Sequence, residues 1–220
     1  MYKLLGVLSL AVFATGCGTL NNALVEKTKT VEYYRIFDIK TNADRQSVAE
    51  AASNGLGRNV NDAKEAMPIP TFSTPPDEPG RFKLVNPFEG SKMAAFAAMG
   101  GGVGLKIATC DGAVWTASAK RDIAGSDNLN ITACLFQYKQ GYHLDVYGTF
   151  SKKEGGLMQI SRSMAGAMVG TPEEWTEKTF LDIVRSIRTA TGADVAFLEG
   201  QPKVVGTPWL DTEAPVADSK

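Results

Sequence analysis

The stretch from Leu105 to Ser151 constrains the fold most, because its pattern predicts several strands joined by short turns. Residues 142–150 (YHLDVYGTF) alternate strictly between apolar and polar positions. The apolar residues share one face: Tyr142, Leu144, Val146 and Phe150. The polar residues share the other face: His143, Asp145, Tyr147 and Thr149. This period of two predicts a strand with one buried and one water-facing side, as in an antiparallel sheet covered by helices on one face.

Two neighbouring segments extend this pattern into a β-meander. Residues 128–138 (NLNITACLFQY) also alternate and are joined to the next strand by a turn at 139–141. Their apolar face holds Leu129, Ile131, Ala133 and Leu135. In residues 105–120, Asp111-Gly112 separates two strand-like runs, which is the strongest short signal for a hairpin. We therefore expect 105–110 to pair with 113–120.

A helix precedes the meander at residues 44–63. Its apolar positions recur every four residues: Val48, Ala52, Leu56 and Val60. Asn42 or Asp44 can cap its start, and Gly55 and Gly57 predict that it weakens or ends in its second half.

The clearest helix follows the meander at residues 171–192. Thr171 suits the N-cap, Pro172 suits the first helical position and Glu174 completes a capping box. Gly192 is placed to end the helix. Its buried stripe is expected to consist of Phe180, Ile183, Val184 and Ile187.

Three weaker patterns complete the element order. Residues 31–40 (VEYYRIFDIK) predict a strand, and Arg35 interrupts its apolar row, which favours an edge position. Residues 157–170 have helical spacing, and residues 194–198 could add a last strand. Strands gathered together, with helices before and after them, predict an α+β fold with an antiparallel β-sheet and helices packed on one face.

Residues 67–88 hold six of the ten prolines, so neither a helix nor a central strand can form there. Two alternatives stand: a linker between two units, or an extended arm laid over the surface. The apolar residues of the segment favour an arm docked on its own domain: Ile69, Phe72, Phe82, Leu84 and Val85. We accordingly expect one α+β domain at 31–199 with a Pro-rich arm at 67–88, followed by a flexible tail at 200–220.

The pattern of the N-terminus predicts an export signal. After Lys3, an apolar run from Leu4 to Ala14 is too short to span a bilayer, which needs ~20 residues, but it has the length of a signal peptide core. The run is followed by Ala14-Thr15-Gly16-Cys17. A buried helix with an incidental cysteine and an unlipidated cleaved signal peptide are the alternatives.

Residues 1–17 resemble the lipobox of bacterial lipoproteins, although that family usually has Leu where this chain has Ala14. The resemblance implies that residues 1–16 are a signal peptide, that Cys17 carries the lipid, and that 17–30 form a tether. Gly18, where Asp would commonly signal retention at the inner membrane, favours the periplasmic face of the outer membrane. Two or more acyl chains would hold the domain firmly on that membrane.

The charge balance excludes some partners. The chain has 23 basic and 24 acidic residues, a net charge of −1. A near-neutral surface lacks the basic footprint of a nucleic-acid-binding protein, so we expect no nucleic acid partner. It also argues against a polybasic grip on anionic lipid.

The other two cysteines predict a disulfide. With Cys17 lipidated, Cys110 and Cys134 form an even pair in an oxidising compartment. The bond would close a loop of about 25 residues and contribute ~3 kcal/mol in the chain-entropy model. It requires pairing that brings the two Cα atoms within ~7 Å; otherwise both are buried free thiols.

The chain offers little for catalysis. His143, the single histidine, is expected on one strand face with Asp145, which could form a general-base pair, or simply part of a solvated polar face. No nucleophile elbow and no metal-binding cysteine or histidine motif occurs in the sequence, so we expect no catalytic residues, metal or cofactor.

Aromatic residues are the candidate binding residues. Phe136 and Tyr138 lie on the strand face opposite Leu135, so either the arm covers them or they form an exposed patch for a partner. Phe72 in the arm and Trp209 in the tail are two further candidates.

Together these features predict a non-enzymatic lipoprotein of the outer membrane that binds a protein partner as an accessory or scaffold subunit of an envelope assembly. The element order also looks loosely like that of the helix-grip accessory lipoproteins of the outer-membrane barrel-assembly machinery, with no shared motif. Two alternatives are a small envelope hydrolase using His143 and Asp145, and a carrier of a hydrophobic ligand or lipid, which would need an apolar cavity of ~300 Å³ or more.

Overall fold

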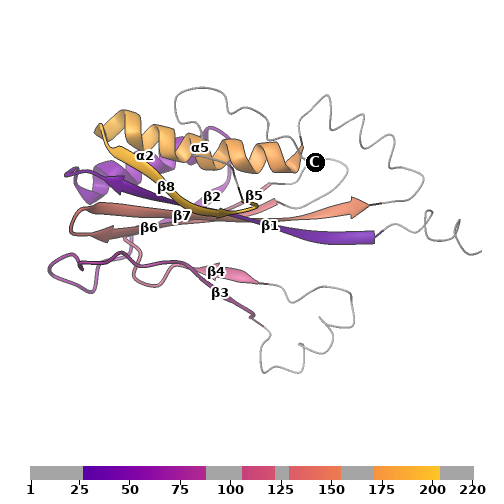
Figure 1. Cartoon of the computed structure of the whole chain (residues 1–220), viewed down its shortest axis with the longest axis horizontal. Coiled ribbons are helices and arrows are strands. Elements are labelled where there is room, and N and C mark those ends of the chain that lie inside the picture. Colours follow the sequence, from indigo (N-terminus) through magenta and orange to yellow (C-terminus); the bar gives the residue numbers. More distant parts are fainter. Residues whose placement is uncertain (1–26, 88–105, 122–128, 155–170, 204–220) are drawn as a thin grey trace, which may run out of the picture.

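The protein is described here from a computed structural model, which describes residues 27–87, 106–121, 129–154 and 171–203. The strands are β1 (Lys27–Lys40), β2 (Ala63–Ala66), β3 (Lys83–Val85), β4 (Ile107–Thr109), β5 (Trp115–Arg121), β6 (Leu129–Tyr138), β7 (Gly141–Glu154) and β8 (Asp194–Gln201), and the helices are α2 (Arg45–Gly57) and α5 (Pro172–Thr191). The main sheet has the order β2-β5-β6-β7-β1-β8, with every neighbouring pair antiparallel. Both helices cover one face of it, and the β3-β4 pair lies across the other (Figure 1). The predicted α+β class is confirmed.

Helix α5 has the termini that its sequence predicts. The Thr171 side chain accepts a hydrogen bond from the Glu174 amide, and the Glu174 side chain accepts one from the Thr171 amide, which completes the capping box. Gly192 ends the helix with a left-handed φ of 64°, a conformation that costs glycine little. Helix α2 starts after Asp44, whose carboxylate accepts hydrogen bonds from the amides of Gln46 and Ser47.

The main core lies between the helices and the sheet. The alternating strands β6 and β7 supply it with the residues that share a face in the sequence pattern: Leu129, Ile131, Ala133, Leu135, Tyr142, Leu144, Val146 and Phe150. The helices supply their predicted stripes: Val48, Ala52 and Leu56 from α2, and Phe180, Ile183, Val184 and Ile187 from α5. Burial of each large side chain stabilises the fold by ~1.5–3 kcal/mol.

Strand β1 is not an edge strand, which corrects one prediction. It pairs with β7 on one side and with β8 on the other. Arg35 does not mark an exposed edge, because its side chain is buried against α5 and forms an ion pair with Glu177, with 2.7 Å between Nη2 and Oε2. Strand β1 also begins at Lys27, within the segment 17–30 that we expected to be a tether.

The hairpin predicted at Asp111-Gly112 is wrong, although the turn exists. The Ala113 amide donates to the Cys110 carbonyl, and Gly112 has a φ of 84°. The strands on either side separate: β4 pairs with β3, whereas β5 pairs with β2 and β6. A local turn signal therefore fixed the reversal of the chain but not the partner of either strand.

Two further strands complete the main sheet, and one predicted helix lies in a part of the chain that the structure does not describe. The last strand is confirmed as β8, and β2 is an edge strand that the sequence pattern did not predict. The helix expected at 157–170 lies outside the described residues. No helix in the described ranges is long and apolar enough to cross a membrane.

The arm predicted at 67–88 reaches the sheet face opposite the helices in its second half. Phe72 packs against the main core, and the chain then passes from Pro76 to β3 beneath the main sheet (Figure 1). We use the word strap for the described part of this layer, residues 76–87 and 106–113. The strap makes the protein three layers thick over part of the sheet, so the expectation that this face meets water is wrong there.

Candidate functional site

A disulfide between Cys110 and Cys134 joins the strap to the main sheet, as the cysteine count predicted. The two Cα atoms are 5.4 Å apart. Cys110 lies just after β4 in the strap, and Cys134 lies within β6. Around the bond is a small apolar cluster separate from the main core, with Cys134, Phe136 and Ala113 buried and Phe82 packed against them.

Further contacts between the strap and the sheet lie around this cluster. The Lys139 amide at the β6–β7 turn donates to the Pro76 carbonyl over 2.9 Å. The Phe82 amide donates to Asp145 Oδ2 over 2.9 Å, and the Phe82 ring lies beside the rings of Tyr34 and Tyr147. At the outer margin, Arg81 pairs with Glu199 of β8 and Lys106 pairs with Glu32 of β1.

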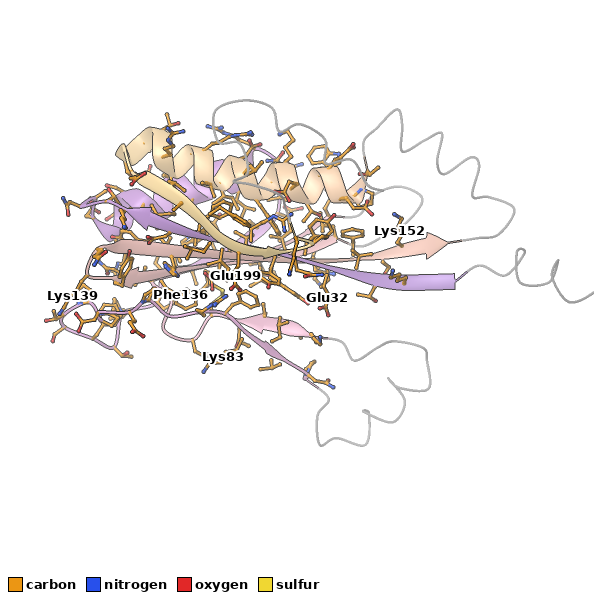
Figure 2. The ribbon with its side chains drawn as sticks, in the orientation of Figure 1. Glu32, Lys83, Phe136, Lys139, Lys152 and Glu199 are labelled. Carbon is orange, nitrogen blue, oxygen red and sulfur yellow. A yellow bond between two sulfur atoms is a disulfide. The ribbon has the colours of Figure 1, made fainter. Side chains whose placement is uncertain are left out.

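This layer covers two of the candidate binding residues. Phe136 is 1% exposed and Tyr138 is 7% exposed, and Figure 2 shows Phe136 between the sheet and the strap. The sequence left two alternatives for Phe136 and Tyr138, coverage by the arm or an exposed patch. In the structure both side chains are covered, so they do not form an exposed patch. Phe72 is half-buried against the main core. Cys17 and Trp209 lie outside the described residues.

Strand β7 brings His143, Asp145 and Tyr147 together in a row beneath the strap. Asp145 is 1% exposed and Tyr147 is 4% exposed. His143 has its Nε2 atom 3.7 Å from Asp38 Oδ1, and the same Asp38 oxygen accepts a hydrogen bond of 2.6 Å from the Tyr138 hydroxyl. The row is therefore flanked by charged and aromatic side chains of β1 and β6.

Burial dominates the ionisation of this row. It raises the pKa of Asp145 to about 6, against the opposing effects of the Phe82 amide and Arg81. Burial lowers the pKa of His143, although the nearby Asp38 carboxylate opposes that change. Burial also raises the pKa of Tyr147, so its hydroxyl stays neutral at physiological pH.

Three polar atoms of the row have no hydrogen-bond partner among the described residues: His143 Nδ1, Asp145 Oδ1 and Tyr147 Oη. Each is buried, and a buried polar group without a partner loses its hydrogen bonds to water and gains none in return. The strap thus covers a row of polar side chains. Among the described residues of the strap, only the Phe82 amide forms a hydrogen bond with this row, and it donates to Asp145 Oδ2.

The chemistry open to His143 and Asp145 is restricted by this position. Two titratable groups with altered pKa values in one cluster are typical of a catalytic site. Here the strap lies over them, and the backbone amide of Phe82 already occupies one carboxylate oxygen. Asp145 is thus closed off from solvent, whereas the His143 side chain keeps 14% of its surface exposed.

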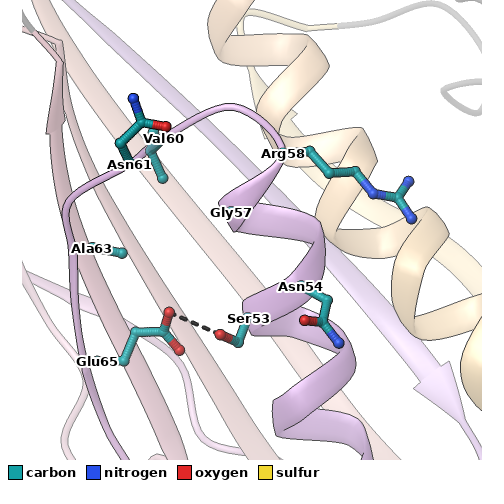
Figure 3. Close-up of a pocket in the computed structure, with 8 residues that line it drawn as sticks. All are labelled: Ser53, Asn54, Gly57, Arg58, Val60, Asn61, Ala63 and Glu65. Carbon is teal, nitrogen blue, oxygen red and sulfur yellow. Dashed lines mark hydrogen bonds between the residues drawn. The ribbon is translucent and has the colours of Figure 1, made fainter.

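An open groove lies between the end of α2 and the edge strand β2 (Figure 3). It has a volume of about 470 Å³ and is open to solvent. Polar side chains predominate in its lining, including Ser53, Arg58 and Glu65. Glu65 is held in place by hydrogen bonds from Ser53 Oγ and from Trp115 Nε1.

A second open groove, of about 340 Å³, lies beside the disulfide between β4 and β5. Its lining includes Thr116, Ser118, Thr132 and Lys64. Neither groove is an enclosed apolar cavity, so the part of the chain that the structure describes gives no support to the carrier alternative. The described part of the chain holds no cluster of three or more His, Cys, Asp or Glu side chains that could bind a metal ion.

Sequence reasoning missed the strap residues Gly80 and Arg81. A Cβ atom on Gly80 would lie 2.6 Å from the ring of Phe136, so the backbone passes directly against that ring. Only the glycine itself and its neighbouring prolines signal such an approach in the sequence, and neither identifies the surface approached. The comparisons with known proteins add nothing to these assignments, because no family model and no curated protein matches the chain.

Proposed function

We propose that this chain is an exported lipoprotein, held by Cys17 on the periplasmic face of the outer membrane, whose domain is a binding or accessory subunit of an envelope assembly. The observation that carries the proposal is the disulfide between Cys110 and Cys134. Structural disulfides persist in oxidising compartments such as the periplasm and are rare in the bacterial cytosol. The bond also leaves Cys17, at the end of the apolar leader, as the one remaining cysteine of the chain.

A binding role is supported by the position of the titratable pair. His143 and Asp145 lie beneath the strap, away from both surface grooves. The open surfaces instead consist of polar grooves and sheet edges, which suit contacts with another protein. The partner is a protein of the cell envelope, reached while the lipid holds the domain at the membrane.

Metabolic labelling with an alkyne fatty acid tests the anchor. The wild type and a Cys110→Ser variant should both carry the label, because both keep the acylated cysteine, Cys17. A Cys17→Ser variant should carry none. Equal label on all three proteins would show that the lipid is not at Cys17 and would remove the basis for the location.

Crosslinking of the intact lipoprotein in its own membrane, followed by purification under denaturing conditions, tests the binding role. We expect one envelope protein to be recovered in near-stoichiometric amount with the wild type and to be lost with Cys17→Ser, which leaves the domain intact but unanchored. Recovery of no protein above the background of an unrelated lipoprotein would contradict the role.

A hydrolase is the second candidate, favoured by the raised pKa of Asp145 beside His143. The single histidine makes the distinction simple, because no other histidine can replace it. A His143→Ala strain that behaves as the wild type in cellular assays, with normal protein level, supports the binding role. A His143→Ala strain that matches the deletion strain, while the protein keeps its fold and its partner, supports the hydrolase.

A further inference from the structure

We propose that the strap is a releasable cover, locked over the sheet by the Cys110–Cys134 disulfide, and that two-electron reduction of this bond opens it while the helix-covered core stays folded. The inference does not depend on the proposed function. It follows from a comparison of what holds the strap down with what opposes its closure.

Hydrogen bonds, ring contacts and ion pairs hold the strap on the sheet. The Pro76 carbonyl accepts a hydrogen bond from the Lys139 amide, the Phe82 amide donates one to Asp145 Oδ2, and the Phe82 ring lies beside the rings of Tyr34 and Tyr147. Its ion pairs lie at the surface: the Arg81–Glu199 side chains are 51% and 47% exposed, the Lys139–Asp77 side chains are 53% and 81% exposed, and the Lys106–Glu32 side chains are 45% and 37% exposed. Exposed ion pairs contribute little to stability, because water screens them.

The surface beneath the strap opposes closure. His143 Nδ1, Asp145 Oδ1 and Tyr147 Oη make no hydrogen bond to any described residue in the closed state. Opening the strap would return all three atoms to water, which can satisfy them. Asp145 also regains the hydration of its carboxylate when the strap leaves.

The disulfide offsets this opposition by keeping the strap close to its binding surface. Cys110 lies just after β4 in the strap, and Cys134 lies in β6. The same strand holds Phe136, whose ring lies against Gly80 of the strap. A crosslink at this place limits the freedom of the open state and so favours the closed one. Reduction removes that restraint without removing any of the groups that oppose closure.

The main core does not share this dependence. It lies on the opposite face of the sheet, where α2 and α5 pack on the strands (Figure 1). The strap residues Phe82 and Ala113 belong instead to the small cluster around the disulfide. Loss of the strap therefore removes the small cluster and leaves the helix-covered face intact.

The chemical step needs a dithiol reductant. Cys110 is partly exposed whereas Cys134 is 1% exposed, so a thiolate of the reductant attacks the Cys110 sulfur. The Cys110–Cys134 bond breaks, and Cys134 leaves as a thiolate that takes up a proton. The second thiol of the reductant then displaces Cys110 as a thiol. The reductant is oxidised to a disulfide, and the protein gains two electrons and two protons.

Hydrogen–deuterium exchange of the full-length chain in detergent, with and without dithiothreitol, tests the proposal. Upon reduction, peptides covering residues 76–87 should exchange at least about tenfold faster, whereas peptides covering Phe180–Ile187 of α5 should change by less than about twofold. Unchanged strap exchange in the reduced protein would show that the strap needs no disulfide. Equal acceleration in α5 would show unfolding rather than release. Either result overturns the proposal.

Two variants sharpen this test. A Cys110→Ser/Cys134→Ser variant should exchange rapidly in the strap with or without dithiothreitol; if it does not fold, the reduced wild type supplies the same measurement. Tyr147→Phe removes one unpaired hydroxyl and should slow strap exchange in the reduced protein by about tenfold. No slowing would contradict the claim that the unpaired polar atoms oppose closure.

Discussion

The two faces of the sheet are closed by different means. The face under α2 and α5 is covered by periodic helices whose apolar stripes meet the apolar positions of β6 and β7. Part of the opposite face is covered by the strap, which is attached through a disulfide, the hydrogen bonds of Pro76 and Phe82, the ring contacts of Phe82 and exposed ion pairs. Side-chain packing along whole elements supports the first cover, and contacts at separate points support the second.

The two faces of the sheet are therefore stabilised differently. Polar groups on the helix face find partners, as Arg35 does with Glu177. Beneath the strap, three polar atoms of β7 remain unpaired in the described structure. Changes to the helix face should therefore affect unfolding of the whole domain, and changes to the strap face should affect a local opening.

The largest effect is expected from Phe180→Ala on the helix face. Phe180 is fully buried in the main core, and its ring packs on Gly148 of β7. Truncation should lower the free energy of unfolding by ~3–5 kcal/mol, because it removes buried apolar area and leaves a cavity. Denaturant unfolding of the oxidised protein measures this change.

Ile69→Ala in the arm is the matched control for Phe180→Ala. Ile69 is 89% exposed, so its truncation should change the free energy of unfolding by less than ~0.5 kcal/mol. If both variants lost the same stability, burial of Phe180 in the main core would not be the cause of its loss.

The next effect concerns pH and the strap face. The pKa of Asp145 rises from 3.8 to about 6 on folding, mainly through burial. The folded chain therefore binds this proton more tightly, and the free energy of unfolding falls as pH rises from about 4 to 6, by ~3 kcal/mol in total. Asp145→Asn keeps an oxygen for the Phe82 amide but cannot ionise. The variant should match the wild type at pH 4 and exceed it at pH 7.5.

Measuring both proteins at each pH isolates Asp145 from His143. The pKa of His143 is lowered on folding, so its contribution is lost as pH falls, and both proteins share that loss. A difference between wild type and variant that stays constant from pH 4 to 7.5 would show that Asp145 is not buried beneath a closed strap.

A smaller effect is expected from Gly55→Ala, where α2 meets α5. A Cβ atom at Gly55 would lie 2.5 Å from the Asp182 carbonyl oxygen, and the helix backbone cannot easily yield. Thermal unfolding should show a loss of ~1–3 kcal/mol. Gly57→Ala is the matched control, because a Cβ there meets nothing within 4 Å and should add ~0.5–1 kcal/mol. Similar losses in both variants would contradict close packing at Gly55.

The smallest effect on global unfolding is expected from Gly80→Ala in the strap. The added Cβ would lie 2.6 Å from the Phe136 ring, but the irregular strap can move away as a helix cannot. The free energy of unfolding should fall by less than ~1 kcal/mol, whereas hydrogen exchange at residues 76–87 should increase several-fold. A loss as large as that of Gly55→Ala would show that the strap and the core unfold together.

Part of the candidate site followed from the sequence. An even pair of cysteines in an exported chain predicted the Cys110–Cys134 bond, and the proline-rich composition of 67–88 predicted an extended arm. The row of His143, Asp145 and Tyr147 followed from the alternation of β7. The burial of that row did not, because an alternating strand has the same polar face whether water or another segment covers it.

Local sequence patterns were enough to predict which residues of β6 and β7 share a face, where α5 begins and ends, and that the chain turns at Gly112. Each depends on backbone geometry over a few residues, namely the period of two, the capping box and a positive φ. Contacts between distant segments were needed to establish that β4 pairs with β3, that β1 lies inside the sheet, and that the strap covers Asp145. Strand partners and covering layers are chosen by competition between distant segments for the same edges and faces, and no local pattern records which segment prevails.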